Sequence, residues 1–420
     1  MPDAYLIVSL VGLLFTLLAL APPRRPAVLS FPFFMAGWVA GDLAVFHIAW
    51  QAVATIVFAA LGAFSAPHGW IGLGVTVVSW AGLWVAYRRH AGVEPLLEEA
   101  LREAMPDELA GVDGGPPLAF AVSRRQLLSP FRMRAADIEV VRNLAYGDHR
   151  RNRLDVYRHA DDATGRPVLL QIHGGAWILG NKRQQGQPLM YDMAARGWVC
   201  VAPNYRLSPR ATFPDHLIDV KRALAWVRQH IHEYGGDPSF VVVTGGSAGG
   251  HLAALLALTP NRPELQPGFE DVDTSVSACV PMYGVFDFLD QNGVRRRASM
   301  RPFLQPIVMK CSPTECRDKW ELASPISQVN PDAPPFFVVS SVHDTLTWVE
   351  DARYFVEALR AVSHERVLYA ELRHAQHAFD VMYTVRTAHV VHAIGRWLDY
   401  LWSSRGTPSP HVAVPAQSTG

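Results

Sequence analysis

The chain has 420 residues, of which half are apolar and 18% are charged, and its 38 basic side chains balance its 38 acidic ones. Nucleic-acid binding requires basic side chains gathered on one face, so nucleic acid is not an expected partner. Residues 1–90 contain only six charged side chains, however. We therefore expect an apolar N-terminal quarter, followed by a water-soluble part long enough for one large core.

The N-terminal quarter is predicted to be a membrane anchor. Three apolar stretches, each long enough to cross a bilayer, occur there: residues 5–21, 27–64 and 70–87. The first stretch lacks the basic start and the small-residue cleavage site of a signal peptide. We predict about three transmembrane helices within residues 1–90, the middle one interrupted by Pro32 and Asp42.

The arginines that flank these stretches predict an orientation. Arg24 and Arg25 follow the first stretch, and Arg88 and Arg89 follow the third. Because basic residues favour the cytoplasmic side, three spans place the N-terminus outside and the rest of the chain in the cytoplasm.

A polar stripe of His47, Gln51 and Thr55 lies on one helix face of the middle stretch. Polar groups inside a membrane form a proton or substrate path in some proteins. We favour the other interpretation, in which the stripe hydrogen-bonds to neighbouring helices.

The rest of the chain divides into three segments. Residues 91–136 are predicted to be a juxtamembrane linker or cap, because an amphipathic helix pattern over 94–105 gives way to the turn-rich stretch 111–117. Residues 137–404 form the main domain. Residues 405–420 are rich in Pro, Ser and small side chains, which predicts a disordered tail.

The main domain alternates short β-branched runs with helical runs, which indicates βαβ units. The predicted strands are 138–144, 153–157, 168–172, 198–202, 240–244, 277–282, 336–340 and 367–371. The sequence therefore predicts the α/β class, with a mostly parallel eight-stranded sheet flanked by helices.

The four cysteines are interpreted as free thiols. Cys200 and Cys279 lie in apolar runs, and Cys311 and Cys316 have no second Cys or His pair at a zinc-ligand spacing. No metal or disulfide framework is expected.

The most informative stretch is FVVVTGGSAGGHLAALLAL, residues 240–258, in which a strand pattern meets a glycine-rich turn and then a helix pattern. G-x-S-x-G in this context is the nucleophile elbow, where Gly246 and its neighbours leave room for a strained Ser247. The amide of Ala248, at the start of the helix, is then placed to bind a developing oxyanion.

A second motif, HGGAW, follows the strand at 168–172. Its glycines allow backbone amides to converge on one point, as an acyl-transfer site requires. Gly174, Gly175 and Ala176 are the candidate donors, and His173 is expected to support the loop rather than to act as a base.

A serine nucleophile needs a base and an orienting carboxylate, which this architecture places downstream in the order Ser, acid, His. Asp344 follows the strand at 336–340, and His377 follows the strand at 367–371. We predict these two over the alternatives Asp351, expected to be a solvated helix residue, and His374, expected to support the site.

Together, HGGAW, YRLSP at 205–209, GGDP at 235–238, GGSAGG, the Asp344 loop and HAF at 377–379 resemble the hormone-sensitive-lipase-like branch of the α/β-hydrolase esterases. The resemblance covers about residues 137–402. Ala176 and Gly246 are closer to the HGGAW subgroup, which includes isoprenylcysteine methylesterase-like and feruloyl-esterase-like enzymes.

The resemblance implies a membrane-anchored serine carboxylesterase or lipase that forms an acyl-enzyme without metal or cofactor. Short- to medium-chain or lipid-derived esters are the expected substrates, and the bilayer is the expected partner. An amidase or peptidase with the same triad, and a catalytically silent binding module, are the alternatives.

We expect a cap over the site from residues 91–135 and the insertion 286–325. The insertion contains Arg295, Arg296 and Arg297, which are expected to be solvated or near anionic lipid.

Overall fold

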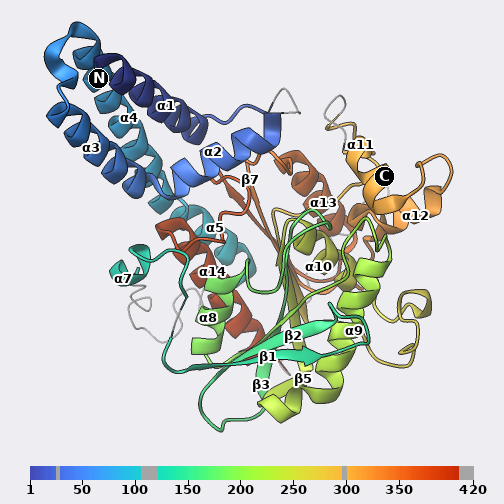
Figure 1. The fold of residues 1–420 in the computed structure, drawn as a ribbon. Helices are drawn as coiled ribbons and strands as arrows, with labels where there is room; N and C mark the ends of the chain where they lie inside the picture. Colours follow the sequence, from blue (N-terminus) through green and yellow to red (C-terminus); the bar gives the residue numbers. More distant parts are fainter. Residues whose placement is uncertain (25–28, 106–121, 134, 296–299, 406–420) are drawn as a thin grey trace, which may run out of the picture.

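The computed structural model describes residues 1–24, 29–105, 122–133, 135–295 and 300–405. It consists of a large α/β part and a bundle of N-terminal helices that projects from it (Figure 1). The predicted tail, most of the turn-rich linker, Arg25, Arg296 and Arg297 lie outside the described residues.

One sheet of eight strands forms the centre of the α/β part. The strands are β1 (Ile138–Ala145), β2 (Arg153–His159), β3 (Arg166–Ile172), β4 (Val199–Pro203), β5 (Gly236–Gly246), β6 (Ala278–Met282), β7 (Phe336–Ser341) and β8 (Val367–Leu372). Their order is β1-β2-β4-β3-β5-β6-β7-β8. β2 runs antiparallel to both of its neighbours, and the strands from β4 to β8 are parallel. The predicted mostly parallel sheet of eight strands is confirmed.

Helices cover both faces of this sheet. α9 (Asp215–His230), α10 (Ala248–Leu258) and α13 (Val349–Val362) bury apolar side chains on one face. α5 (Glu94–Ala104), α8 (Gln187–Ala195) and α14 (Val385–Ser403) do so on the other. Sheets with parallel strands are stable only when covered in this way. The short helices are α7 (Arg124–Leu127), α11 (Arg301–Phe303), α12 (Arg317–Leu322), η2 (Ala63–Ser65), η3 (Ile231–Tyr234), η4 (Pro263–Leu265), η6 (Leu304–Met309) and η7 (Pro325–Gln328).

The helix predicted as a linker or a cap, α5, is built into the core. Leu97 and Leu101 are buried, and the helix packs against β8 and α14. It therefore connects the bundle to the sheet.

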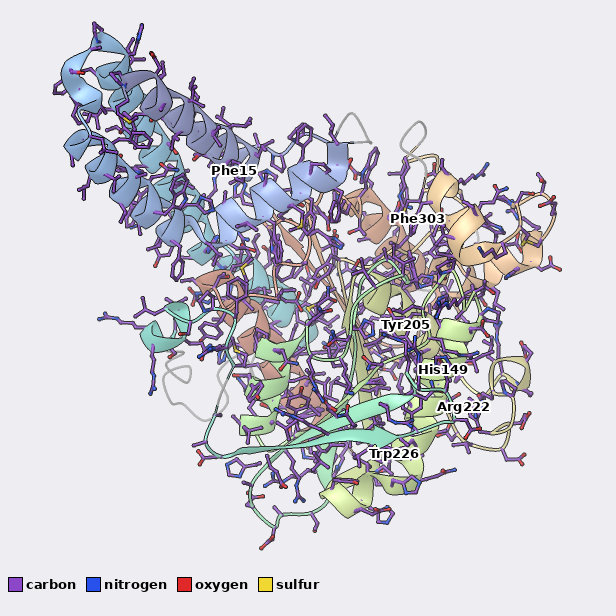
Figure 2. The ribbon with its side chains drawn as sticks, in the orientation of Figure 1. Phe15, His149, Tyr205, Arg222, Trp226 and Phe303 are labelled. Atoms are coloured by element: carbon purple, nitrogen blue, oxygen red, sulfur yellow. A yellow bond between two sulfur atoms is a disulfide. The ribbon has the colours of Figure 1, made fainter. Side chains whose placement is uncertain are left out.

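Three helices lie side by side in the N-terminal bundle: α1 (Pro2–Leu20), α3 (Ala44–Ala60) and α4 (Pro67–Ala91) (Figure 1). Many of their large apolar side chains are exposed, and side chains project from the outside of the bundle in Figure 2; the exposed ones include Ile7, Leu14, Val53, Ile56, Trp70 and Val78. Among the described residues, two helices, α1 and the one that begins at Pro67, are long and apolar enough to cross a membrane. There are three spans if the bent pair of α2 (Ser30–Asp42) and α3 counts as one.

The middle apolar stretch is interrupted at Asp42, as the sequence predicted, but not at Pro32, which lies in the first turn of a helix. It divides into α2 (Ser30–Asp42) and α3, which are bent by 87° to each other. The break follows Asp42, whose carboxylate pairs with Arg386 of α14 at 2.7 Å and so holds the end of α2 against the α/β part. Only α3 continues along the bundle, and α2 lies across the top of the α/β part (Figure 1).

The polar stripe faces the neighbouring helices in part. The Tyr5 hydroxyl lies 3.0 Å from the Thr55 hydroxyl, and Gln51 is buried against Gly12 of α1. Thr16 and Ser79 join α1 to α4 in the same way, at 2.7 Å. The interpretation of the stripe as hydrogen bonds between helices is therefore confirmed for Thr55. The Gln51 side chain packs against α1, and its amide nitrogen has no hydrogen-bond partner among the described residues.

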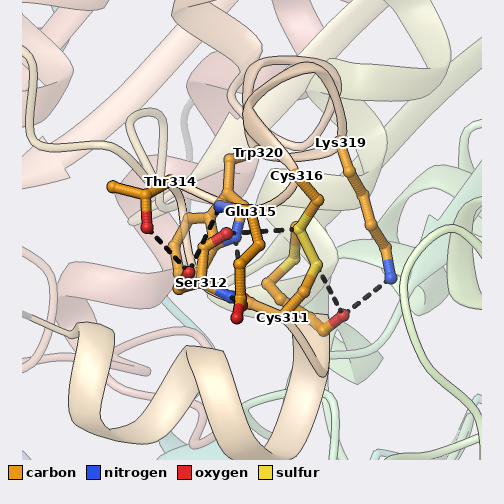
Figure 3. Close-up of a disulfide and its surroundings, with 8 residues drawn as sticks. Cys311, Ser312, Thr314, Glu315, Cys316, Lys319 and Trp320 are labelled. Carbon is orange, nitrogen blue, oxygen red and sulfur yellow. Dashed lines mark hydrogen bonds between the residues drawn. A yellow bond between two sulfur atoms is a disulfide. The ribbon is translucent and has the colours of Figure 1, made fainter.

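Two predictions about the insertion 286–325 are wrong. Cys311 and Cys316 form a disulfide rather than free thiols, because the turn between them brings their Cα atoms to 6.3 Å (Figure 3). Arg295 is buried rather than solvated, because it pairs with Asp351, which was itself predicted to be solvated. A buried arginine requires such a partner.

Candidate active site

Ser247 lies in the turn between β5 and α10. Its backbone has φ 59° and ψ −124°, a strained conformation for a residue with a side chain. The glycines on both sides are required by space, since a Cβ on Gly245 would lie 2.6 Å from the carbonyl oxygen of Gly249. The turn therefore holds the Ser247 hydroxyl out at the carboxyl edge of the sheet.

The structure brings together the three residues predicted as a triad. The hydroxyl oxygen of Ser247 lies 2.8 Å from Nε2 of His377, and Nδ1 of His377 lies 2.7 Å from Oδ2 of Asp344. If Nδ1 carries the proton of a neutral imidazole, Nε2 is free to accept a proton from the serine. The arrangement can thus make a serine hydroxyl nucleophilic.

Asp344 is fully buried and held by its own loop. Its Oδ1 accepts hydrogen bonds from the amides of Leu346 and Thr347, each at 2.8 Å, and its Oδ2 accepts one from the Thr347 hydroxyl at 2.7 Å. The side chain of Gln376 joins this loop to the next one, since it accepts hydrogen bonds from the amides of Thr345 and His377. These bonds fix the orientation of the carboxylate toward the imidazole.

Two aromatic rings surround the His377 imidazole, and the sequence indicated neither. Tyr283 contacts it edge-on with ring centroids 4.8 Å apart, and Phe34 of α2 does so at 5.7 Å. The Tyr283 hydroxyl donates to Asp380, a carboxyl group whose pKa is raised by burial. A Cβ on Gly246 would collide with that hydroxyl, so a residue with a side chain does not fit at position 246. These residues come from the loop after β6, from α2 and from the loop after β8, so no local pattern could have grouped them.

The HGGAW loop approaches Ser247 after β3. Gly175, Ala176 and Trp177 have positive φ angles of 115°, 50° and 61°, which turn successive backbone amides to one side. The amide of Gly174 already donates to the side chain of Gln185 at 2.5 Å. The candidate oxyanion donors are therefore Gly175 and Ala176, together with Ala248, whose amide at the start of α10 has no acceptor within the helix.

His173 and His251 hold this loop as neutral side chains. His173 stacks on Tyr205, which lies inside the α/β part (Figure 2). Burial lowers the pKa of His173 to about 4. The indole nitrogen of Trp177 donates to His251, whose other nitrogen bonds the carbonyl of Ala323, and burial lowers the pKa of His251 to about 3. His374, the alternative to His377, instead has its ring edge against His343 at 4.9 Å.

Within the described residues, no group of three or more His, Cys, Asp and Glu side chains could hold a metal ion. The candidate site is thus formed by a hydroxyl, an imidazole, a carboxylate and backbone amides.

The fold and its nucleophile elbow define the class, an α/β hydrolase. The BD-FAE family profile matches residues 154–359. The probable carboxylic ester hydrolase LipM of Mycobacterium tuberculosis is 51% identical over 279 residues, which are 65% of this chain and 64% of LipM, so the match spans less than two thirds of that relative. The esterase LipC of the same organism is 38% identical over 328 residues, covering 76% of this chain and 78% of LipC.

A solved structure agrees with these relatives. The thermophilic esterase Est2 of Thermogutta terrifontis is 25% identical, with a TM-score of 0.52 over 66% of this chain and 95% of Est2. The chain therefore belongs to the hormone-sensitive-lipase-like family of α/β-hydrolase esterases, in the branch that carries the BD-FAE domain.

Proposed function

We propose that this protein is a serine carboxylesterase, with Ser247 as nucleophile, His377 as general base and Asp344 as the orienting acid. The observation that carries the proposal is the continuous hydrogen-bonded chain from the Ser247 hydroxyl through His377 to the buried Asp344. The names of LipM and LipC, an ester hydrolase and an esterase, support the same chemistry.

In the proposed mechanism the Ser247 oxygen attacks the ester carbonyl while its proton moves to Nε2 of His377. The amides of Gly175, Ala176 and Ala248 stabilise the oxyanion, and one such donor contributes a factor of about 10² to 10³ in related sites. His377 then gives the proton to the leaving alcohol, and an acyl-enzyme forms. Water, deprotonated by His377, releases the acid and restores the serine.

Carboxylic esters with short to medium acyl chains, or lipid-derived esters, are the proposed substrates. Est2 has been solved with butyrate and with propionate bound, which supports small acyl groups in this fold. An amidase would use the same residues, so the assay includes the p-nitroanilide of each acid tested as its p-nitrophenyl ester.

A fluorophosphonate probe tests the proposal directly. We expect it to label the full-length protein on one peptide that contains Ser247, and to leave the Ser247→Ala variant unlabelled, because only an activated serine reacts. The wild-type protein should hydrolyse the p-nitrophenyl esters and leave the anilides intact. A wild-type protein that neither reacts with the probe nor cleaves an ester is a silent binding module, and faster cleavage of the anilides identifies an amidase.

We further infer that the helical bundle anchors the protein in a bilayer, with the α/β part on the cytoplasmic side. The outward apolar faces of the bundle support the anchor. The N-terminus and the turn at 61–66 lie at its far end, whereas Arg24, Arg88 and Arg89 lie where it joins the α/β part (Figure 1). Since basic residues mark the cytoplasmic side, the site lies there as well.

The Cys311–Cys316 pair provides the test of this orientation, because disulfides rarely persist in the cytoplasm. In the reducing cytoplasm we expect the Cys311–Cys316 disulfide of the structure to be reduced, so both cysteines should be free thiols when cells are lysed directly into an alkylating reagent and the modified peptides are weighed. An added thiol oxidant should then close the disulfide, which shows that the pair can form. An already closed pair in untreated cells places the α/β part on the opposite side.

A further inference from the structure

Helix α2 of the N-terminal region lies directly against the candidate active site. Phe34, on the inner side of α2, is 6% exposed, and its ring meets the His377 imidazole edge-on at 5.7 Å. Trp38, one turn further, stacks on Phe34 with centroids 5.4 Å apart. The face of His377 that Phe34 covers is therefore bounded by the membrane region and not by the α/β part alone.

Polar contacts fasten α2 and its neighbours to both loops of the proposed triad. Arg24, six residues before α2, donates to the carbonyl of Val342 at 2.7 Å, two residues before Asp344, and pairs with Glu350 at 3.0 Å. Asp42, at the other end of α2, pairs with Arg386.

Arg386 also donates to the carbonyl of His374 at 2.8 Å, three residues before His377. The Asp42–Arg386 pair therefore anchors the C-terminal end of α2 beside the site, and Phe34 packs against His377 nearer its start.

The outer side of α2 is apolar and open. Phe31 and Met35 are 61% and 38% exposed, on a helix without charged residues before Asp42. Because α2 is bent by 87° from α3, it runs parallel to the bilayer surface when the bundle crosses the bilayer. An apolar helix in that orientation lies in the interface between lipid headgroups and acyl chains.

We propose that α2 forms the membrane-side wall of the substrate site, with Phe34 as a specificity-determining residue. The substrates are esters dissolved in the bilayer, and they reach Ser247 along the outer face of α2. The proposal rests on the proposed esterase function. It explains why one helix presents Phe34 to His377 and leaves Phe31 and Met35 uncovered.

Two sets of variants test the wall and the route separately. Both are made in the full-length protein, which is reconstituted in phosphatidylcholine nanodiscs. For the wall, kcat/KM is measured on p-nitrophenyl esters of two to sixteen carbons. Phe34→Ala should raise the ratio of dodecanoate to acetate hydrolysis at least about tenfold, because it opens space beside His377, and Phe34→Trp should lower that ratio. An equal change on all esters in both variants shows a merely structural Phe34 and overturns this part.

For the route, the double variant Phe31→Asn/Met35→Gln is compared with Leu128→Asn, which changes an exposed apolar residue directly after α7. The double variant should hydrolyse a bilayer-dissolved fluorogenic decanoate about tenfold more slowly, with p-nitrophenyl acetate within about twofold of wild type. Leu128→Asn should change neither rate. An unchanged decanoate rate in the double variant rejects the route. Failure of the proposed esterase function is distinguishable from failure of the route, because in that case the wild-type protein would not react with the fluorophosphonate.

Discussion

Replacing His377 with alanine is expected to lower kcat for p-nitrophenyl butyrate by about 10⁶-fold, and Ser247→Ala should cost as much. The reason is geometric: the two side chains share one hydrogen bond of 2.8 Å, and neither can activate the ester alone. The Ser247→Ala/His377→Ala double variant should therefore be no slower than either single variant. Additive losses would show that the two residues do not act as a unit.

His374→Ala is the matched control for the base. His374 lies three residues from His377, but its ring faces His343 and no hydrogen bond to Ser247 is seen. We expect kcat within a few-fold of wild type. The reverse result, with His374→Ala inactive and His377→Ala active, would assign the base to His374. Circular dichroism of each variant separates loss of chemistry from loss of fold.

The parts of the fold that the sequence predicted correctly have local causes. β-branched runs, the glycines around Ser247 and the helix after it are set by contacts within a few residues, and all eight predicted strands are present. Asp344 and His377 could be proposed because the ends of adjacent parallel strands, β7 and β8, meet at one sheet edge. The order of the strands along the chain was therefore enough to predict that these two residues lie close together.

The parts that the sequence could not predict depend on residues far apart in the chain. The bend at Asp42 is fixed by Arg386, 344 positions later. The sequence indicated an interruption at Asp42, but neither the angle of the bend nor the partner of the carboxylate. Two other contacts become visible only in the folded chain. The Gln185 side chain accepts a hydrogen bond from the amide of Gly174, and the Phe34 ring contacts His377.

Removing either partner of the Asp42–Arg386 pair is expected to destabilise the protein by about 3–5 kcal/mol. Both side chains are almost completely buried, so Arg386→Ala leaves the Asp42 carboxylate without its charge partner, and Asp42→Ala does the same to Arg386. The exposed pair Arg353–Glu371 provides the control, because Arg353→Ala should cost at most about 1 kcal/mol. Thermal unfolding in detergent micelles, followed by tryptophan fluorescence, measures the difference.

The apolar double variant Asp42→Leu/Arg386→Met then separates charge from packing. Because it leaves no unpaired charge, it should recover most of the stability that either single variant loses. If it does, the cost in the single variants lies in the stranded charge, and the pair chiefly fixes where α2 docks. Single variants as stable as Arg353→Ala would instead mean that water reaches this junction, and that Phe34, Trp38 and the Arg24 contacts hold α2 against His377.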